Sequence, residues 1–513
     1  MIFSIEIRKH VSINVPHKQY KVQCYSDAER SSVSVSSAFA HIDQQLAQKA
    51  FQKQSAGRLS IDLLILESAS LNQFRRHMPN TSALMEKMGF LFFYGYNKVA
   101  DNSLVNLHPL LTGRLFRNLT ESYPIRFPQP AEWEIDMSEF IWNSPSMEGC
   151  GSLFLSDPIG NFDTYYYPNQ AVQGFSKAPA DYYGRGWLRE RAAARSSLFP
   201  NQSFLCGDKY VAEGMLEVQE QFMRSLANHC HFSKCHPSSI IHDHPTHLHL
   251  LDEEVSGMLR RLDESGALNA TLFAVLGDHG ARMGGHVSSL LGRLEERMPL
   301  LAVHLPPCFR TAHPELMRRL RINRHRLTSN FDFHQLLRDV ADGRFHPDAP
   351  PAYPQLRGTS LFKEIPAQRS CAEAGIPWKY CACLQPYYYS GGLEEAELRR
   401  NVSGLLGQLM AESECGQRMG NQTALLLGRL QILSPSAAVR EPPPASMVYA
   451  QAEFSYGGLG MLARLRLGGP STEAACPSTL RLQGTPLVTH GLPPNCTNRT
   501  FPEACLCLAE SFD

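Results

Sequence analysis

The chain has 513 residues, 43% of them hydrophobic, and its 49 basic residues balance its 49 acidic ones. This length is too great for one simple core and predicts two domains, or one large domain with an appendage. The zero net charge and the lack of any apolar run near the ~18 residues of a transmembrane helix give no sign of nucleic-acid binding or of a membrane-spanning segment.

The first 55 residues are polar, so we predict an irregular N-terminal arm over 1–55. From 56 to 365, apolar runs typical of buried strands alternate with helical patterns. Strands are expected at 59–66, 90–96, 152–155, 238–241, 271–276 and 299–304. Helices are expected after Pro79 up to Gly89, with Asn80 or Thr81 as the N-cap, and at 104–112, 210–227 and 251–266. The alternation predicts an α/β fold with a mostly parallel central sheet and helices on both faces.

The region 366–513 is richer in Cys, Pro and Gly, and its periodicity is weak. Eight of the fourteen cysteines lie there, at Cys371, Cys381, Cys383, Cys415, Cys476, Cys496, Cys505 and Cys507. An even number of cysteines crowded at one end predicts a disulfide framework, and therefore a Cys-rich C-terminal region.

Eight Asn-x-Ser/Thr sequons exceed the two or three expected by chance and indicate a glycoprotein. They lie at Asn80, Asn118, Asn201, Asn269, Asn401, Asn421, Asn495 and Asn498. With the cysteines, they predict an extracellular or secretory-pathway protein. The start of the chain has charges where a signal peptide would have its apolar core, so we expect a signal or a membrane anchor to precede it.

The run 229–236 contains Cys230, Cys235 and three histidines. It is either a zinc site or a source of disulfide cysteines. Its spacing fits no standard zinc finger, which favours the disulfide role.

The strand expected at 271–276 ends at Gly277, followed by Asp278, His279 and Gly280. Ligand sites of open α/β sheets lie outside the carboxyl ends of strands. An adjacent carboxylate and imidazole there either ligate one divalent cation or form an ordinary turn.

Two other expected strands end in acidic residues, at Glu67 and at Asp243, and His247 follows four residues after Asp243. Clustered carboxylates repel one another unless a cation lies among them. Ser103 stands at a loop-to-helix junction, where it is either an N-cap or a nucleophile activated by a metal.

This order of an acidic strand end, a serine at a helix start, Asp-x-x-x-His and Asp-His-Gly resembles the alkaline-phosphatase and sulfatase superfamily. The chain resembles still more closely a poorly characterised animal family with an alkaline-phosphatase-like domain of unknown function. The matching blocks are 78–81, 95–98, 101–102, 111–113, 181–183, 278–280, 296–299, 326–328, 371–377 and 380–383.

The resemblance implies a hydrolase or transferase of phosphate or sulfate esters, with Ser103 as nucleophile and Asn106 as a hydrogen-bond donor to the developing negative charge. It implies one or two divalent ions, zinc first, with manganese or calcium as alternatives. One ion would be held by Glu67, Ser103, Asp278 and His279, and the other by Asp243, His247 and a further histidine. His286 is the nearest candidate for that histidine, and His304, His334 and His490 are its rivals, although His334 is more typical of a helix face.

The chain departs from the superfamily at Glu67, where Asp is usual, and at Leu71, where Arg is frequent. The Cys/Ser-x-Pro-x-Arg signature of formylglycine sulfatases is absent, which favours a phosphate ester as substrate. Two hypotheses therefore stand: an active metal-dependent enzyme, or a catalytically inactive extracellular binding protein on the same fold.

Overall fold

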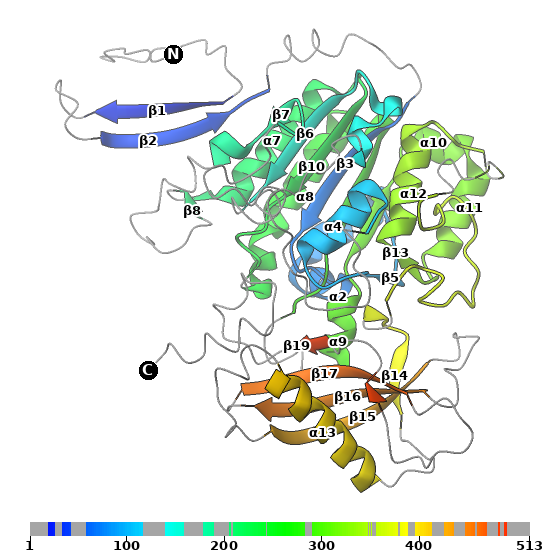
Figure 1. The fold of residues 1–513 in the computed structure, drawn as a ribbon. Coiled ribbons are helices and arrows are strands. Elements are labelled where there is room, and N and C mark those ends of the chain that lie inside the picture. The colour runs from blue at the N-terminus through cyan, green and yellow to red at the C-terminus, as the bar shows by residue number, and fades with distance from the viewer. Residues whose placement is uncertain are drawn as a thin grey trace.

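The fold is that of a computed structural model. It describes residues 19–25, 33–42, 58–115, 139–157, 178–188, 205–206, 209–242, 244–282, 290–346, 348, 350, 355–377, 380–387, 395–412, 425–435, 447–456, 459–468, 481–482 and 487–489. A main α/β body and a smaller, six-stranded sheet make up most of this part of the chain (Figure 1).

Seven strands form the central sheet of the main body, in the order β4-β12-β11-β3-β10-β6-β7. Their bounds are β3 Ser60–Leu66, β4 Leu91–Phe92, β6 Gly151–Ser156, β7 Tyr182–Tyr183, β10 His231–His236, β11 Thr271–Gly277 and β12 Leu301–His304. Strands β11, β3, β10, β6 and β7 are parallel, whereas β12 is antiparallel to both of its neighbours. The predicted mostly parallel sheet is confirmed.

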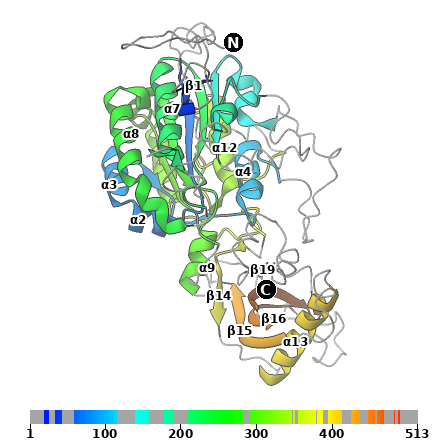
Figure 2. The same cartoon turned by 90° about the vertical axis from the view of Figure 1, so that its left-hand side faces the viewer.

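Helices cover both faces of this sheet (Figure 2), as predicted. One face carries α2 Leu71–His77, α3 Pro79–Met88, α7 Val211–Ser225 and α8 Asp252–Glu264, and the other α4 Ser103–Thr112, α10 Pro307–Ala312, α11 Pro314–Asn323 and α12 Asn330–Ala341. Alternate side chains of β3 serve the two cores: Ile61, Leu63 and Ile65 pack on the α4/α12 side, and Leu64 and Leu66 on the α7/α8 side. Burial on both faces explains why this strand is apolar apart from Ser60 and Asp62, which have hydrogen-bond partners inside the core.

The remaining elements of the main body are short. They are β5 Tyr96–Asn97, β8 Leu205–Cys206, β9 Lys209–Tyr210, β13 Thr328–Ser329, α9 Leu290–Arg297 and the 3₁₀ helices Ile141–Asn143, Pro145–Met147, Pro245–Leu251 and Ala267–Ala270. The single strand expected at 90–96 is two strands, since β4 joins the main sheet and β5 pairs with β13.

The strand expected at 238–241 is wrong. The strand is β10, and the apolar pair Ile240 and Ile241 is buried in the turn that follows it. The hydrophobic pattern misses β10 because polar groups on it pair inside the core. His231 Nε2 lies 2.9 Å from Asp62 Oδ2, and the Ser233 hydroxyl donates a hydrogen bond to the same carboxylate.

The predicted N-cap of α3 is also wrong. The helix begins at Pro79, and no side chain at its start caps it. Its free N–H groups are satisfied from another helix instead, because Asp252 accepts hydrogen bonds from the backbone of Asn80 at 3.0 Å and of Thr81 at 2.7 Å. The predicted end at Gly89 is confirmed, with φ +81°.

Outside the main body, β1 Gln19–Tyr25 and β2 Val33–Ala40 form an antiparallel hairpin within the predicted arm. The C-terminal region contains β14 Leu384–Tyr387, β15 Leu425–Pro435, β16 Met447–Tyr456, β17 Leu459–Gly468, β18 Arg481–Leu482, β19 Leu487–Thr489 and α13 Glu395–Glu412. These strands pair antiparallel, and α13 lies against β15 (Figure 1). None of the helices in the described ranges is both long and apolar enough to cross a membrane.

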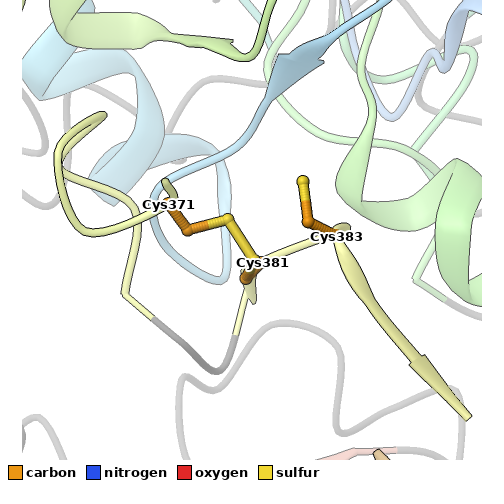
Figure 3. Close-up of side chains that lie close together, drawn as sticks. All are labelled: Cys371, Cys381 and Cys383. Carbon is orange, nitrogen blue, oxygen red and sulfur yellow. A yellow bond between two sulfur atoms is a disulfide. The ribbon is translucent and has the colours of Figure 1, made fainter. Parts of the chain in front are cut away.

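Two disulfides brace the main body. Cys150–Cys230 joins the residues just before β6 and β10, and Cys371–Cys381 closes a short loop that packs into the α4/α12 core. Figure 3 shows the free thiol of Cys383 beside the second bridge. Cys230 therefore takes the disulfide role that its run of cysteines and histidines favours, while Cys235 is a buried free thiol. The cysteines at 415, 476, 496, 505 and 507 lie outside the described residues.

Candidate functional site

The carboxyl ends of two central strands bring Glu67 and Asp278 together. Strands β3 and β11 are parallel with Leu66 opposite Gly277, so the next residues of both strands are neighbours. Glu67, Asp278 and His279 are buried, and one ligand atom of each lies within 4.8 Å of the others. These are three of the residues predicted from the sequence.

Ser103 lies against this group from the start of α4. Its Oγ is 3.1 Å from Oε1 and 3.2 Å from Oε2 of Glu67. The N-cap of α4 is Asn102, whose side chain accepts a hydrogen bond from the Val105 N–H at 3.4 Å. The capping interpretation of Ser103 is therefore not needed, because its neighbour caps the helix.

Asn106 holds the loop before α4. Its Oδ1 accepts hydrogen bonds from the N–H groups of Val99 and Ala100, at 2.9 and 3.0 Å. Its Nδ2 donates to the carbonyls of Ala100 and Asn102, at 2.9 and 3.0 Å. Both amide hydrogens are engaged and the side chain is fully buried, so the amide positions the backbone around Ser103 and does not face a substrate.

Two residues of this site were not predicted. His236, the last residue of β10, has Nε2 3.0 Å from Glu67 Oε2. Arg282 Nη1 lies 3.1 Å from Asp101 Oδ2. Burial alone would lower the pKa of Arg282, but the acidic residues around it, Asp101, Glu67 and Asp278, together raise this pKa above its usual value. Arg282 therefore stays positively charged beside the site.

The backbone after β3 is tightly constrained. Ser68 has φ +55°, a left-handed conformation that costs a non-glycine residue about 1–2 kcal/mol. In return its N–H donates to Asp278 Oδ1 at 2.9 Å and its hydroxyl to Glu67 Oε1 at 3.2 Å. Across the site, a side chain at Gly280 would overlap the backbone carbonyl of Glu295 in α9.

His279 has the tautomer and the protonation state that metal ligation requires. Its Nδ1 lies 2.9 Å from the carbonyl oxygen of Gly280, which can only accept, so Nδ1 carries the proton of the neutral ring. Burial, the larger influence, lowers the pKa of His279, and the attraction of Asp278 only partly opposes it. The bare Nε2 then lies 3.3 Å from Asp278 Oδ2 and 3.6 Å from Glu67 Oε1.

Three lone pairs therefore face one another in a buried space. Neither His279 Nε2 nor Asp278 Oδ2 has a hydrogen-bond partner. Burial raises the pKa of Glu67, but the close contact with His236 outweighs burial and holds this pKa well below its usual range, so Glu67 is an anion. A divalent cation is the group that satisfies such a set, and nitrogen and oxygen ligands suit zinc or manganese.

The predicted second metal set is not assembled in the described part of the chain. Asp243, His286 and His490 lie outside it. His247 Nδ1 lies 3.2 Å from the Ile240 carbonyl, and its ring packs on His244 at 4.7 Å.

The other two candidate histidines lie elsewhere. His304 is opposite Phe273, near the start of β11, because β12 is antiparallel, so it lies at the edge of the sheet away from Asp278. His334 is held by the Leu110 carbonyl at 2.8 Å and by Arg338 at 3.2 Å, as expected of a residue on a helix face.

The family model described as "Protein of unknown function (DUF229)" matches residues 3–396. No curated protein sequence matches the chain. Among solved structures, a protein in the alkaline phosphatase superfamily from Vibrio parahaemolyticus is 12% identical, with 88% of this chain and 86% of that chain covered and a TM-score of 0.41.

Two further solved structures are similar to this chain. The phosphonate monoester hydrolase SpPMH from Silicibacter pomeroyi is 12% identical, with 80% and 89% of the two chains covered and a TM-score of 0.39. The lipoteichoic acid synthase LtaP from Listeria monocytogenes is 11% identical, with 63% and 82% covered and a TM-score of 0.36.

Proposed function

The chain belongs to the family described as "Protein of unknown function (DUF229)", and for this member we propose a metal-dependent hydrolase or transferase that acts on phosphate esters, or on sulfate esters, through Ser103. The observation that carries the proposal is that Asp278 Oδ2 and His279 Nε2, both buried and without a hydrogen-bond partner, lie within 4.8 Å of the Glu67 carboxylate, which accepts a hydrogen bond from Ser103.

Glu67, Asp278, His279 and Ser103 would hold the ion. Zinc fits this mixture of oxygen and nitrogen ligands best, and manganese or calcium would also accept its carboxylates. The glutamate that replaces the usual aspartate still reaches the group, because its carboxylate lies within 4.8 Å of the ligand atoms of Asp278 and His279. A second ion held by Asp243, His247 and a third histidine stays a prediction.

A divalent ion bound there would lower the pKa of the Ser103 hydroxyl and neutralise charge on the substrate. Ser103 Oγ would release its proton to water and attack phosphorus: the bond from Oγ to phosphorus forms, and the bond to the leaving oxygen breaks with the electron pair on that oxygen, which takes up a proton from water. Water, or an acceptor alcohol in a transferase, next attacks the phosphoserine and restores the hydroxyl. The positive end of α4 and the guanidinium of Arg282 would balance the charge of the phosphoryl oxygens.

A phosphate ester is the favoured substrate, because the serine is unmodified in the sequence and the residues after it do not form the formylglycine signature. We also propose the extracellular space or the secretory pathway as the location. The two disulfides support it, as do sequons at Asn80 and Asn269, whose side chains are exposed.

The test compares hydrolysis of an aryl phosphate, an aryl phosphodiester and an aryl sulfate by the wild type, Ser103→Ala and Ser256→Ala. Ser256 is a buried helical serine of α8 that bonds within its own helix, so it controls for the loss of a hydroxyl. We expect Ser103→Ala to lose at least roughly 10³-fold in turnover and Ser256→Ala to keep it.

Metal analysis of the same preparations completes the test. Wild-type protein that holds no stoichiometric ion, cannot be loaded with zinc or manganese and turns over none of the three esters would refute the enzyme and favour the inactive binding protein. Equal turnover by the wild type and Ser103→Ala would remove Ser103 as nucleophile.

A further inference from the structure

His236 occupies the central position at the carboxyl edge of the sheet. It ends β10, which lies between β3 and β6, so carboxylates that follow those two strands flank it: Glu67 and Asp157. His236 is only 2% exposed and Glu67 only 1%. An imidazole is costly to bury without a partner, so the buried position of His236 indicates that its ring has a specific interaction.

The two oxygens of the Glu67 carboxylate have different neighbours. Oε1 faces His279 Nε2 at 3.6 Å and accepts a hydrogen bond from Ser68, on the side of Asp278. Oε2 lies 3.0 Å from His236 Nε2. Ser103 Oγ lies almost equally far from both oxygens, at 3.1 and 3.2 Å.

The carboxylate of Asp157 is occupied by hydrogen bonds to the turn that follows β10. One of its oxygens accepts from the N–H groups of Ser238 and Ser239, and the other accepts from the Ser239 hydroxyl at 2.9 Å. These bonds fix the turn after β10. Glu67 is therefore the carboxylate that pairs with the ring of His236, through the 3.0 Å ion-pair contact of Nε2 with Oε2, although Nε2 makes no hydrogen bond of good geometry.

We propose that His236 is a positioning residue for the metal centre: it holds Oε2 of Glu67 and so presents Oε1 to the ion. This inference rests on the proposed metal site. A ligating carboxylate with one free oxygen can rotate or chelate, whereas one with a fixed second oxygen offers a single ligand atom in a set direction. His236 acts through Glu67 and itself touches neither the ion nor the substrate.

The experiment measures affinity for Zn²⁺ and Co²⁺ by competition with a chromophoric chelator, in the wild type, His236→Ala and His236→Gln. A glutamine amide can donate to Glu67 but is a poor ligand for zinc or cobalt. We expect His236→Ala to bind both ions about 10–100-fold more weakly and His236→Gln to recover most of that loss. The visible absorption bands of the Co²⁺ form should keep the wild-type shape in His236→Gln, since the ligands are unchanged and Oε2 of Glu67 is still held.

His304→Ala and His304→Gln are the matched controls. His304 is equally buried, at 3% exposed, but lies at the opposite edge of the sheet. Its substitution should change thermal stability and leave metal affinity at the wild-type value, which separates a loss of packing from a loss of positioning.

Three results would overturn the inference, and they can be told apart. Wild-type affinity in His236→Ala, with the wild type binding metal, refutes the positioning role alone. Failure of His236→Gln to recover affinity, together with altered Co²⁺ bands, shows that His236 is a direct ligand. A wild type that binds neither ion removes the proposed metal function and this inference with it.

Discussion

The two disulfides should contribute unequally to stability, because they close loops of very different length. Cys150–Cys230 spans 80 residues of sequence and Cys371–Cys381 spans 10. In the chain-entropy description, the entropy that a bridge removes from the unfolded chain is a constant plus a part that grows with the logarithm of the loop length. That relation gives about 4.5 kcal/mol for the longer loop and about 2.7 kcal/mol for the shorter one at 25 °C, a difference of about 1.8 kcal/mol.

The variants are Cys150→Ala/Cys230→Ala and Cys371→Ala/Cys381→Ala, each of which loses two sulfur atoms from the same body. Urea unfolding followed by tryptophan fluorescence suits the comparison, because Trp142 is buried in that body. A peptide map without reductant checks that the wild type has both bridges. If the short-loop variant lost as much free energy of unfolding as the long-loop variant, or more, loop entropy would not be the origin of the stabilisation.

Three other substitutions, one of them paired with a control, test the buried polar groups and the site. Asp62→Asn should lower the free energy of unfolding by about 3–5 kcal/mol, because it leaves His231 buried without its counter-charge. Burial lowers the pKa of His231, but Asp62 and the hydrogen bonds outweigh burial and raise this pKa above the usual 6.5. The stability difference between the wild type and Asp62→Asn should therefore be full below about pH 6.5 and shrink as the pH rises through the pKa that His231 has in the folded protein. Urea titrations that gave the same difference at about pH 6 and at about pH 9 would contradict this. Asn106→Ala should lower turnover of an aryl phosphate by roughly 10²-fold, since the loop before α4 loses its anchor. Asn323→Ala, which frees a different buried loop, should lose stability without losing turnover, and parallel losses of turnover in the two would argue against positioning. Gly280→Ala should abolish zinc-induced stabilisation in thermal unfolding, because its methyl group would overlap the backbone of α9; a wild-type melting curve with zinc would count against that packing.

The sequence predicts the fold where strands are buried on both faces. Strand β3 is apolar over 63–66 and strand β11 over 272–276, so their ends, and with them Glu67 and Asp278, could be located. Strand β10 could not, because His231 and Ser233 are polar residues whose partner, Asp62, lies on another strand. A hydrophobic pattern registers polarity but does not show that two polar side chains satisfy each other.

The same limit explains the site. His236 was missed because its strand was assigned elsewhere, and a histidine gains meaning there only as the last residue of a parallel strand beside Glu67. The contacts of the Asn106 side chain could not be predicted for another reason. All its partners are backbone groups, which every residue has, so no pattern of residue types could indicate them.

The left-handed backbone of Ser68 has a consequence for how this site can change by mutation. Glycine, asparagine and aspartate tolerate that conformation, so drift at this position can pass through them while the N–H still reaches Asp278. Valine, isoleucine and threonine cannot follow, because a β-branched side chain clashes there. The residues permitted at position 68 are thus limited first by a torsion angle, and within that limit serine alone of these residues donates a hydroxyl hydrogen bond to Glu67, a proposed metal ligand.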